Sequence, residues 1–219
     1  MKRQKKEKKL SKGKKEKQAF GKGKKGKKLC GNSEYSTKTT GDRDEDEIVL
    51  TDYSERKLQI KIKQKGETAL KKIGDLTCLE SFSLTGSPSA RSSVSDISPL
   101  GNLTNLKNLS LTDTSVSDIS PLASMKKLEF LKLNDTDVSD VSSLENLTRL
   151  TYLDLSNTKV SSISPLANLI NLKQLYLNNT SVSDISPLAS MTKMKRLNLN
   201  STSVSDISPL ASMTKLEIL

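Results

Sequence analysis

Six side chains with the chemistry of a protein-binding surface recur in two rows, at spacings of 22 residues or a multiple of 22. The first row holds Phe130, Tyr152 and Arg196, and the second holds Lys132, Asp154 and Tyr176. Each flanks the first leucine of an L-x-L pattern, so on a β-strand all six side chains point away from the leucines. Neighbouring strands lie about 4.8 Å apart, which places the aromatic residues of successive copies within contact. Aromatic and arginine anchors with a polar rim are typical of binding hot spots, and we predict that these six residues bind a protein partner.

The rings also have an ordinary explanation, because aromatic residues favour strands for packing reasons alone. The apolar positions that alternate with them are occupied almost entirely by Leu, Ile, Val and Met. The rings are therefore not needed to fill a core, which favours the binding interpretation.

The sequence offers no groups for catalysis. It contains no His, and the glycines of 21–28 (GKGKKGKK) lie in a run of lysines with no strand before them, unlike a phosphate-binding loop. Cys30 and Cys78 are too few for a disulfide framework or a metal site, so we expect two thiols in a reducing compartment. We predict no catalytic residue, no metal, no cofactor and no small-molecule substrate.

The first 28 residues carry 15 Lys and Arg against two Glu, a net charge of +13 that leaves −2 for the rest of a chain whose total is +11. Three interpretations are open: a nuclear address, non-specific RNA or DNA contact, and attachment to anionic membrane. No apolar run follows this basic start, and no apolar stretch is long enough to span a membrane. We therefore expect an intracellular protein of the nucleus or cytoplasm.

The element that must position the six residues is a repeat of 22 residues, whose copies open at Leu100, Leu122, Leu144, Leu166, Leu188 and Leu210. In 100–121 (LGNLTNLKNLSLTDTSVSDISP), L-x-x-L-x-L predicts a short strand that stacks in parallel on its neighbours. Ser-Pro in the return half predicts a short helix or 3₁₀ turn, with Ser as its cap. The recurring aspartates are expected to cap the same turn, the alternative being an acidic binding ladder: Asp96, Asp118, Asp140, Asp184 and Asp206.

Three regions follow from these patterns. Residues 1–47 are predicted to be a disordered, Lys-rich basic arm and polar linker, and 48–72 an N-terminal capping segment with a strand through Leu58 and Ile60. Residues 73–219 are predicted to be six full repeats, the first with five extra residues, and a seventh that ends at Leu219. A repeat array needs a polar terminal unit, so we expect further repeats and a cap beyond Leu219, or else a partner or a second copy over the last strand.

The pattern L-x-x-L-x-L at this period resembles the leucine-rich repeats, and the motif DISPLA (184–189) resembles the 22-residue subclass. That subclass includes the internalins and the nuclear regulatory subunit of type-1 protein phosphatase. The resemblance implies an α/β solenoid, a right-handed superhelix with short parallel strands on its concave face and 3₁₀ or short helical turns on its convex face. The sequence departs from the family where Thr replaces the usual Asn, which predicts a weaker hydrogen-bond ladder between repeats: Thr114, Thr136, Thr158, Thr180 and Thr202.

Together these patterns predict a protein–protein interaction scaffold or adaptor that binds its partner on the concave face. The resemblance adds phosphatase regulation as a candidate role. Two alternatives remain: a nucleic-acid-associated nuclear protein that uses residues 1–28, and a surface adhesin of the internalin type.

Overall fold

The structure is a computed structural model that describes residues 49–54, 57–61, 70–71, 73–86 and 91–217. The predicted disorder of residues 1–47 and both roles of the basic arm fall outside these residues. Leu58 and Ile60 lie in the second strand of the sheet, at the N-terminal end of the array.

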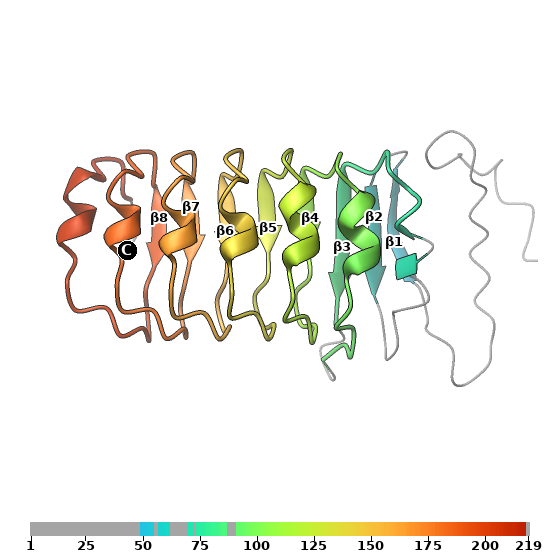
Figure 1. Ribbon diagram of the computed structural model, residues 1–219, viewed down its shortest axis with the longest axis horizontal. Helices are drawn as coiled ribbons and strands as arrows, with labels where there is room; N and C mark the ends of the chain where they lie inside the picture. The colour runs from blue at the N-terminus through green and yellow to red at the C-terminus, as the bar shows by residue number, and fades with distance from the viewer. Residues whose placement is uncertain (1–48, 55–56, 62–69, 72, 87–90, 218–219) are drawn as a thin grey trace, which may run out of the picture.

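One eight-stranded sheet runs along the molecule in sequence order from β1 to β8 (Figure 1). β1 pairs with β2 antiparallel, and every later pair is parallel and in register, as the repeat predicts. The strands are β1 (Val49–Ser54), β2 (Lys57–Lys61), β3 (Ser81–Thr85), β4 (Asn108–Ser110), β5 (Phe130–Lys132), β6 (Tyr152–Asp154), β7 (Gln174–Tyr176) and β8 (Arg196–Asn198).

A second layer of 3₁₀ turns faces the sheet, so each repeat is one strand and one turn (Figure 1). The predicted parallel solenoid is therefore confirmed. The turns are η1 (Ser98–Asn102), η2 (Ser120–Ser124), η3 (Ser142–Leu144), η4 (Ser164–Leu166), η5 (Ser186–Leu188) and η6 (Ser208–Ser212).

Capping of these turns differs in part from the prediction. The capping position is a buried Ile or Val, such as Ile119, and Ser120 is the first residue of the turn, so the expected serine cap is wrong. The carboxylate of Asp118 instead accepts the Ser120 amide at 2.8 Å. The same bond recurs at Asp96, Asp140, Asp184 and Asp206. Because the core requires an apolar residue at the capping position, the acceptor moves one residue back, and the predicted capping by aspartate is confirmed.

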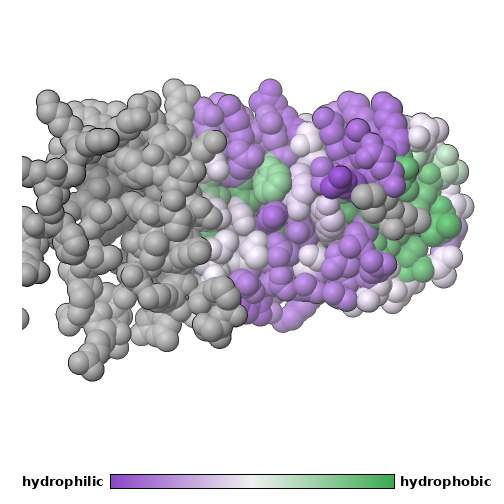
Figure 2. All heavy atoms as spheres, turned by 180° about the vertical axis from the view of Figure 1, so that it is seen from behind, coloured by the Kyte–Doolittle hydropathy of each residue, from purple (hydrophilic) through white to green (hydrophobic). Residues whose placement is uncertain are grey.

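The core is a continuous column of aliphatic side chains between the two layers. The strand leucines, such as Leu131 and Leu153, are fully buried at 0% exposure. Phe82 of β3 takes a leucine position and is buried as well, so one ring does fill the core. Hydrophobic residues are more exposed at the C-terminal end of the array, where Ile207 is 58% exposed (Figure 2).

The repeated threonines do not link the repeats to one another. The Thr158 hydroxyl donates to the Leu155 carbonyl in the same repeat at 2.6 Å, and the other four threonines bond in the same way. The link between repeats is a backbone bond such as Leu155 N–H to Tyr176 O at 2.9 Å. The assumption that threonine takes over an inter-repeat ladder is therefore wrong, because its short side chain reaches only the carbonyl three residues earlier.

The residue before each threonine carries the sharp bend after the strand. Asp113, Asp135, Asn157, Asn179 and Ser201 all have φ between 55° and 59°. Asp and Asn tolerate this left-handed conformation better than other residues with side chains, which explains why they recur at this position.

Cys78 is disulfide-bonded, so the expectation of a free thiol at this position is wrong. Cys30 lies outside the described residues.

Candidate protein-binding site

The outward side chains of β3 to β8 form one surface, here called the strand face. The parallel register brings Phe130 beside Tyr152, and Lys132 beside Asp154. The next pair of strands brings Asp154 beside Tyr176. Because inward leucines alternate with these residues, the sheet carries them on the face opposite the core.

Three rings from successive strands form an aromatic ridge, which is defined by Phe130, Tyr152 and Tyr176. The Phe130 and Tyr152 rings stack with centroids 4.1 Å apart and an interplanar angle of 17°. Tyr176 follows at 5.5 Å from Tyr152, tilted by 42°. All three side chains are only partly buried, so the ridge keeps apolar surface available to another molecule. The sequence-predicted contact between neighbouring rings is confirmed.

Polar contacts hold the rings of the ridge in place. The Tyr152 hydroxyl donates a long hydrogen bond of 3.5 Å to Oδ2 of Asp154, and Oδ1 of Asp154 accepts the Ser156 hydroxyl at 2.6 Å. Burial, and then the negative charge of Asp154, raise the pKa of the Tyr152 hydroxyl. Tyr152 is therefore a neutral donor at physiological pH. The Tyr176 hydroxyl donates to Oε1 of Gln174 at 3.3 Å.

A cation lies over the first two rings. The Lys132 Nζ is 5.6 Å from the Phe130 centroid and 5.8 Å from the Tyr152 centroid. Both distances fall within the range of a cation–π interaction. The rim of the ridge therefore presents a positive charge next to apolar surface.

The sixth predicted residue lies apart from the other five. Arg196 is on β8, where its register neighbour is Gln174 rather than a ring of the ridge. It is exposed. Gln174, which was not selected from the sequence, holds Tyr176 through a hydrogen bond. Its place in the first row, midway between Tyr152 and Arg196, was the signal that could have identified it.

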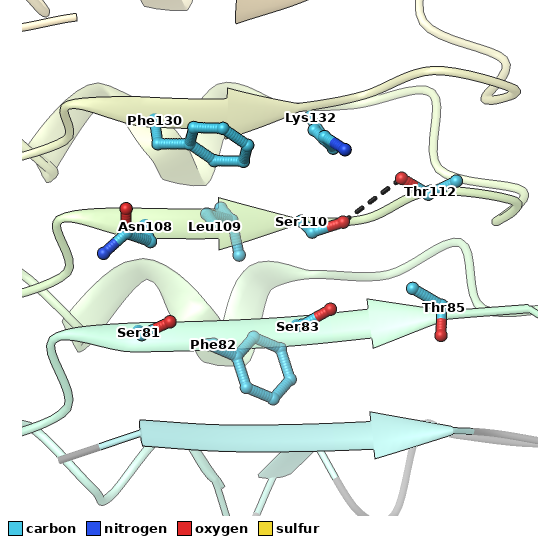
Figure 3. Close-up of a pocket in the computed structure, with 10 residues that line it drawn as sticks. All are labelled: Ser81, Phe82, Ser83, Thr85, Asn108, Leu109, Ser110, Thr112, Phe130 and Lys132. Carbon is cyan, nitrogen blue, oxygen red and sulfur yellow. Dashed lines mark hydrogen bonds between the residues drawn. The ribbon is translucent and has the colours of Figure 1, made fainter. Parts of the chain in front are cut away.

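Beside the ridge, the strand face contains a hollow that the sequence analysis missed (Figure 3). It has a volume of about 420 Å³. Small polar side chains of β3 and β4 line it, and Phe130 and Lys132 of β5 form its wall on the side of the ridge. The signal in the sequence was the run of serines at the outward positions of the first two repeats: Ser81, Ser83 and Ser110.

Two further features bear on the chemistry of the chain. Within the described ranges, no three His, Cys, Asp or Glu side chains come together as a set of metal ligands. In the same ranges, no helix has the length and apolar character needed to cross a bilayer.

Stacked parallel strands, a leucine core and a 3₁₀ turn in each repeat define a class, and the chain is a leucine-rich-repeat protein. The family model for leucine-rich repeats in two copies matches residues 126–168 and 170–212. Repeats of this family support a role in protein–protein interaction.

Two solved structures of internalins from Listeria monocytogenes are similar to this chain. The internalin inlF is 30% identical with a TM-score of 0.67, and the match covers 74% of this chain and 46% of that one. Internalin C2 is 34% identical with a TM-score of 0.65, and the match covers 68% of this chain and 65% of that one. The chain thus spans less than two thirds of either internalin. No curated protein matches it in sequence.

Proposed function

We propose that this chain is a protein-interaction module that binds a protein partner on its strand face, with the aromatic ridge as the anchor. The observation that carries the proposal is the stacking of Phe130, Tyr152 and Tyr176 on the face opposite the core. The leucine core is closed without these rings, so the fold does not need them for burial. Partly exposed aromatic surface beside Lys132 and Asp154 has the composition of a binding hot spot.

The other roles have weaker support. Phosphatase regulation and nucleic-acid contact through residues 1–28 rest on the sequence alone. The similar internalin structures favour an adhesin-type role over these two. The proposed location in the nucleus or cytoplasm is weakened by the disulfide of Cys78, because disulfides persist mainly in oxidising compartments.

The test is a variant with Phe130→Ala, Tyr152→Ala and Tyr176→Ala in the full chain. Partners are first captured with the unchanged chain, and the affinity of each purified partner is then measured for both proteins. A ring in a hot spot contributes about 2 kcal/mol or more, so the variant should lose at least 100-fold in affinity. Circular dichroism should show an unchanged fold, because the rings lie outside the core.

The matched control is Asn178→Ala, a polar position on the same side of the array beyond β7. It should retain the affinity of the unchanged chain. Equal affinity of the ridge variant and the control would place the binding site elsewhere.

A further inference from the structure

We propose that the hollow beside the aromatic ridge binds a carboxylate side chain of an acidic segment in the protein partner, while an apolar group of that segment packs on Phe130. This inference rests on the proposed function for the protein nature of the partner. It adds the chemistry of the segment that is recognised and the place where it binds.

The hollow arises from a step in the side-chain size of the strand face. β3 and β4 present Ser81, Ser83 and Ser110 outward, whereas the next strand presents Phe130 and Lys132 (Figure 3). The serines leave a volume of about 420 Å³ in front of β3 and β4. A protruding side chain of a partner can enter this space and rest against the wall of the ridge.

The hydrogen-bonding groups of the hollow are mainly donors. The Thr112 hydroxyl donates to Oδ1 of Asn134 at 2.8 Å, so the proton in the 3.1 Å contact with Ser110 comes from Ser110. The hydroxyls of Ser81 and Ser83 have no hydrogen-bond partner among the described residues, nor has the side-chain amide of Asn108. These groups can all donate to an acceptor placed in the hollow.

The charges around the hollow are positive. No carboxylate lines it, and Lys132 stands at its wall. Lys132 has no ion pair within the described residues, although its side chain is partly buried. On the opposite side, the register places Lys57 beside Ser81 and Lys61 beside Thr85. A partly buried cation is stabilised by a compensating anion, and the hollow itself supplies none.

The nearest carboxylates are already engaged. Asp154 lies beside Lys132 on the far side from the hollow and accepts bonds from Tyr152 and Ser156. Glu80 pairs with Lys107 at 3.0 Å. An anion in the hollow is therefore not opposed by a free carboxylate at its lining.

A carboxylate fits these groups better than a sugar does. Sugar hydroxyls donate as well as accept, and the hollow has no carboxylate to receive their protons. A carboxylate only accepts, which matches a lining of hydroxyl donors and one ammonium group. Phe130 next to Lys132 adds a surface for an apolar group adjacent to the acid.

The probe is a fluorescent 12-residue peptide with Phe-Glu-Glu at the centre of a Gly-Ser background, and its counterpart with Phe-Gln-Gln. Binding to the full chain is measured by fluorescence anisotropy. We expect the acidic peptide to bind at least tenfold more tightly than the amide peptide. Lys132→Met should weaken the acidic peptide roughly tenfold, the effect of one charge-assisted hydrogen bond. Ser83→Tyr should abolish the binding difference between the two peptides, because its ring fills the hollow while tyrosine remains a good strand residue.

The matched control is Lys195→Met, which removes an equal charge from an exposed lysine paired with Glu217. This variant should bind the acidic peptide as the unchanged chain does. The basic residues 1–28 are present in every variant, so their attraction for the acidic peptide cancels in the comparison.

Three results would overturn the inference: equal binding of the acidic and amide peptides, acidic binding that ignores Lys132→Met and Ser83→Tyr, or a neutral oligosaccharide that Ser83→Tyr displaces while the peptide stays bound. Its failure is distinguishable from failure of the proposed function. If the ridge variant loses the captured partner while Lys132→Met and Ser83→Tyr keep it, the proposed function stands and the acidic hollow is wrong. If peptide binding depends on Lys132 while the ridge variant keeps its partner, the ridge is wrong and the hollow stands.

Discussion

Replacing Thr158 by valine tests what the repeated threonine does for the fold. The Thr158 hydroxyl donates to the Leu155 carbonyl at 2.6 Å, and the side chain is only 7% exposed. A buried acceptor that loses its donor costs about 1–3 kcal/mol. The valine methyl returns less than about 0.8 kcal/mol through burial. Thr158→Val should therefore lower the free energy of unfolding by about 1–2 kcal/mol.

Thr202→Val is the matched control, because the same bond exists there in a different setting. The Thr202 hydroxyl donates to Leu199 O at 2.7 Å, but the site is only partly buried, and the Thr202 amide donates to the same carbonyl at 3.2 Å. The carbonyl keeps one donor and has access to water, so this variant should lose about 0.5 kcal/mol or less.

Both variants are compared with the unchanged chain by urea denaturation followed by circular dichroism. Equal slopes with a lower midpoint for Thr158→Val would show a loss of stability without a change in the surface exposed on unfolding. A neutral Thr158→Val, or a Thr202→Val that costs as much, would refute the conclusion that the buried bond within the repeat is what the threonine contributes.

Three further predictions concern other parts of the fold. Gly86→Ala should destabilise the chain by about 1–3 kcal/mol, because its Cβ would overlap the backbone carbonyl of Asp113, whereas Gly101→Ala, whose Cβ meets nothing closer than 3.7 Å, should be nearly neutral; thermal unfolding compares the two. Asp154→Asn should lower the raised pKa of Tyr152 by removing a nearby negative charge, and an ultraviolet titration in which this tyrosine ionises at the same pH with and without the substitution would contradict that cause. Four capping aspartates have a pKa below the ordinary 3.8, because hydrogen bonds from the serine two residues later stabilise each carboxylate. Their contribution to stability is present above pH 3.8 and lost as the pH falls through the lower folded values; Asp→Asn keeps the acceptor, so denaturation at a series of pH values should show a weaker acid dependence in the variant with all four replaced: Asp96, Asp118, Asp184 and Asp206.

The sequence by itself determined the repeat, the parallel stacking and the surface on which the rings lie. A period of 22 residues brings each position beside its equivalent in the next repeat, so one alternation of leucines with other residues settles the inner and outer faces of every strand. The contact of Phe130 with Tyr152 and of Tyr152 with Tyr176 follows from that register alone. The capping aspartates were also predictable, because their bonds span only two residues.

Only the tertiary structure decided which groups satisfy one another and where the surface is hollow. Thr158 was expected to act between repeats, yet the carbonyl within its reach belongs to Leu155 of the same repeat. The disulfide of Cys78 depends on a contact that the repeat pattern does not encode. The hollow is defined by small side chains of β3 and β4 next to a large one of β5, three segments from different repeats. A repeat pattern specifies which positions are equivalent, whereas bonding and shape depend on the side chains that meet there and on the distances between their atoms.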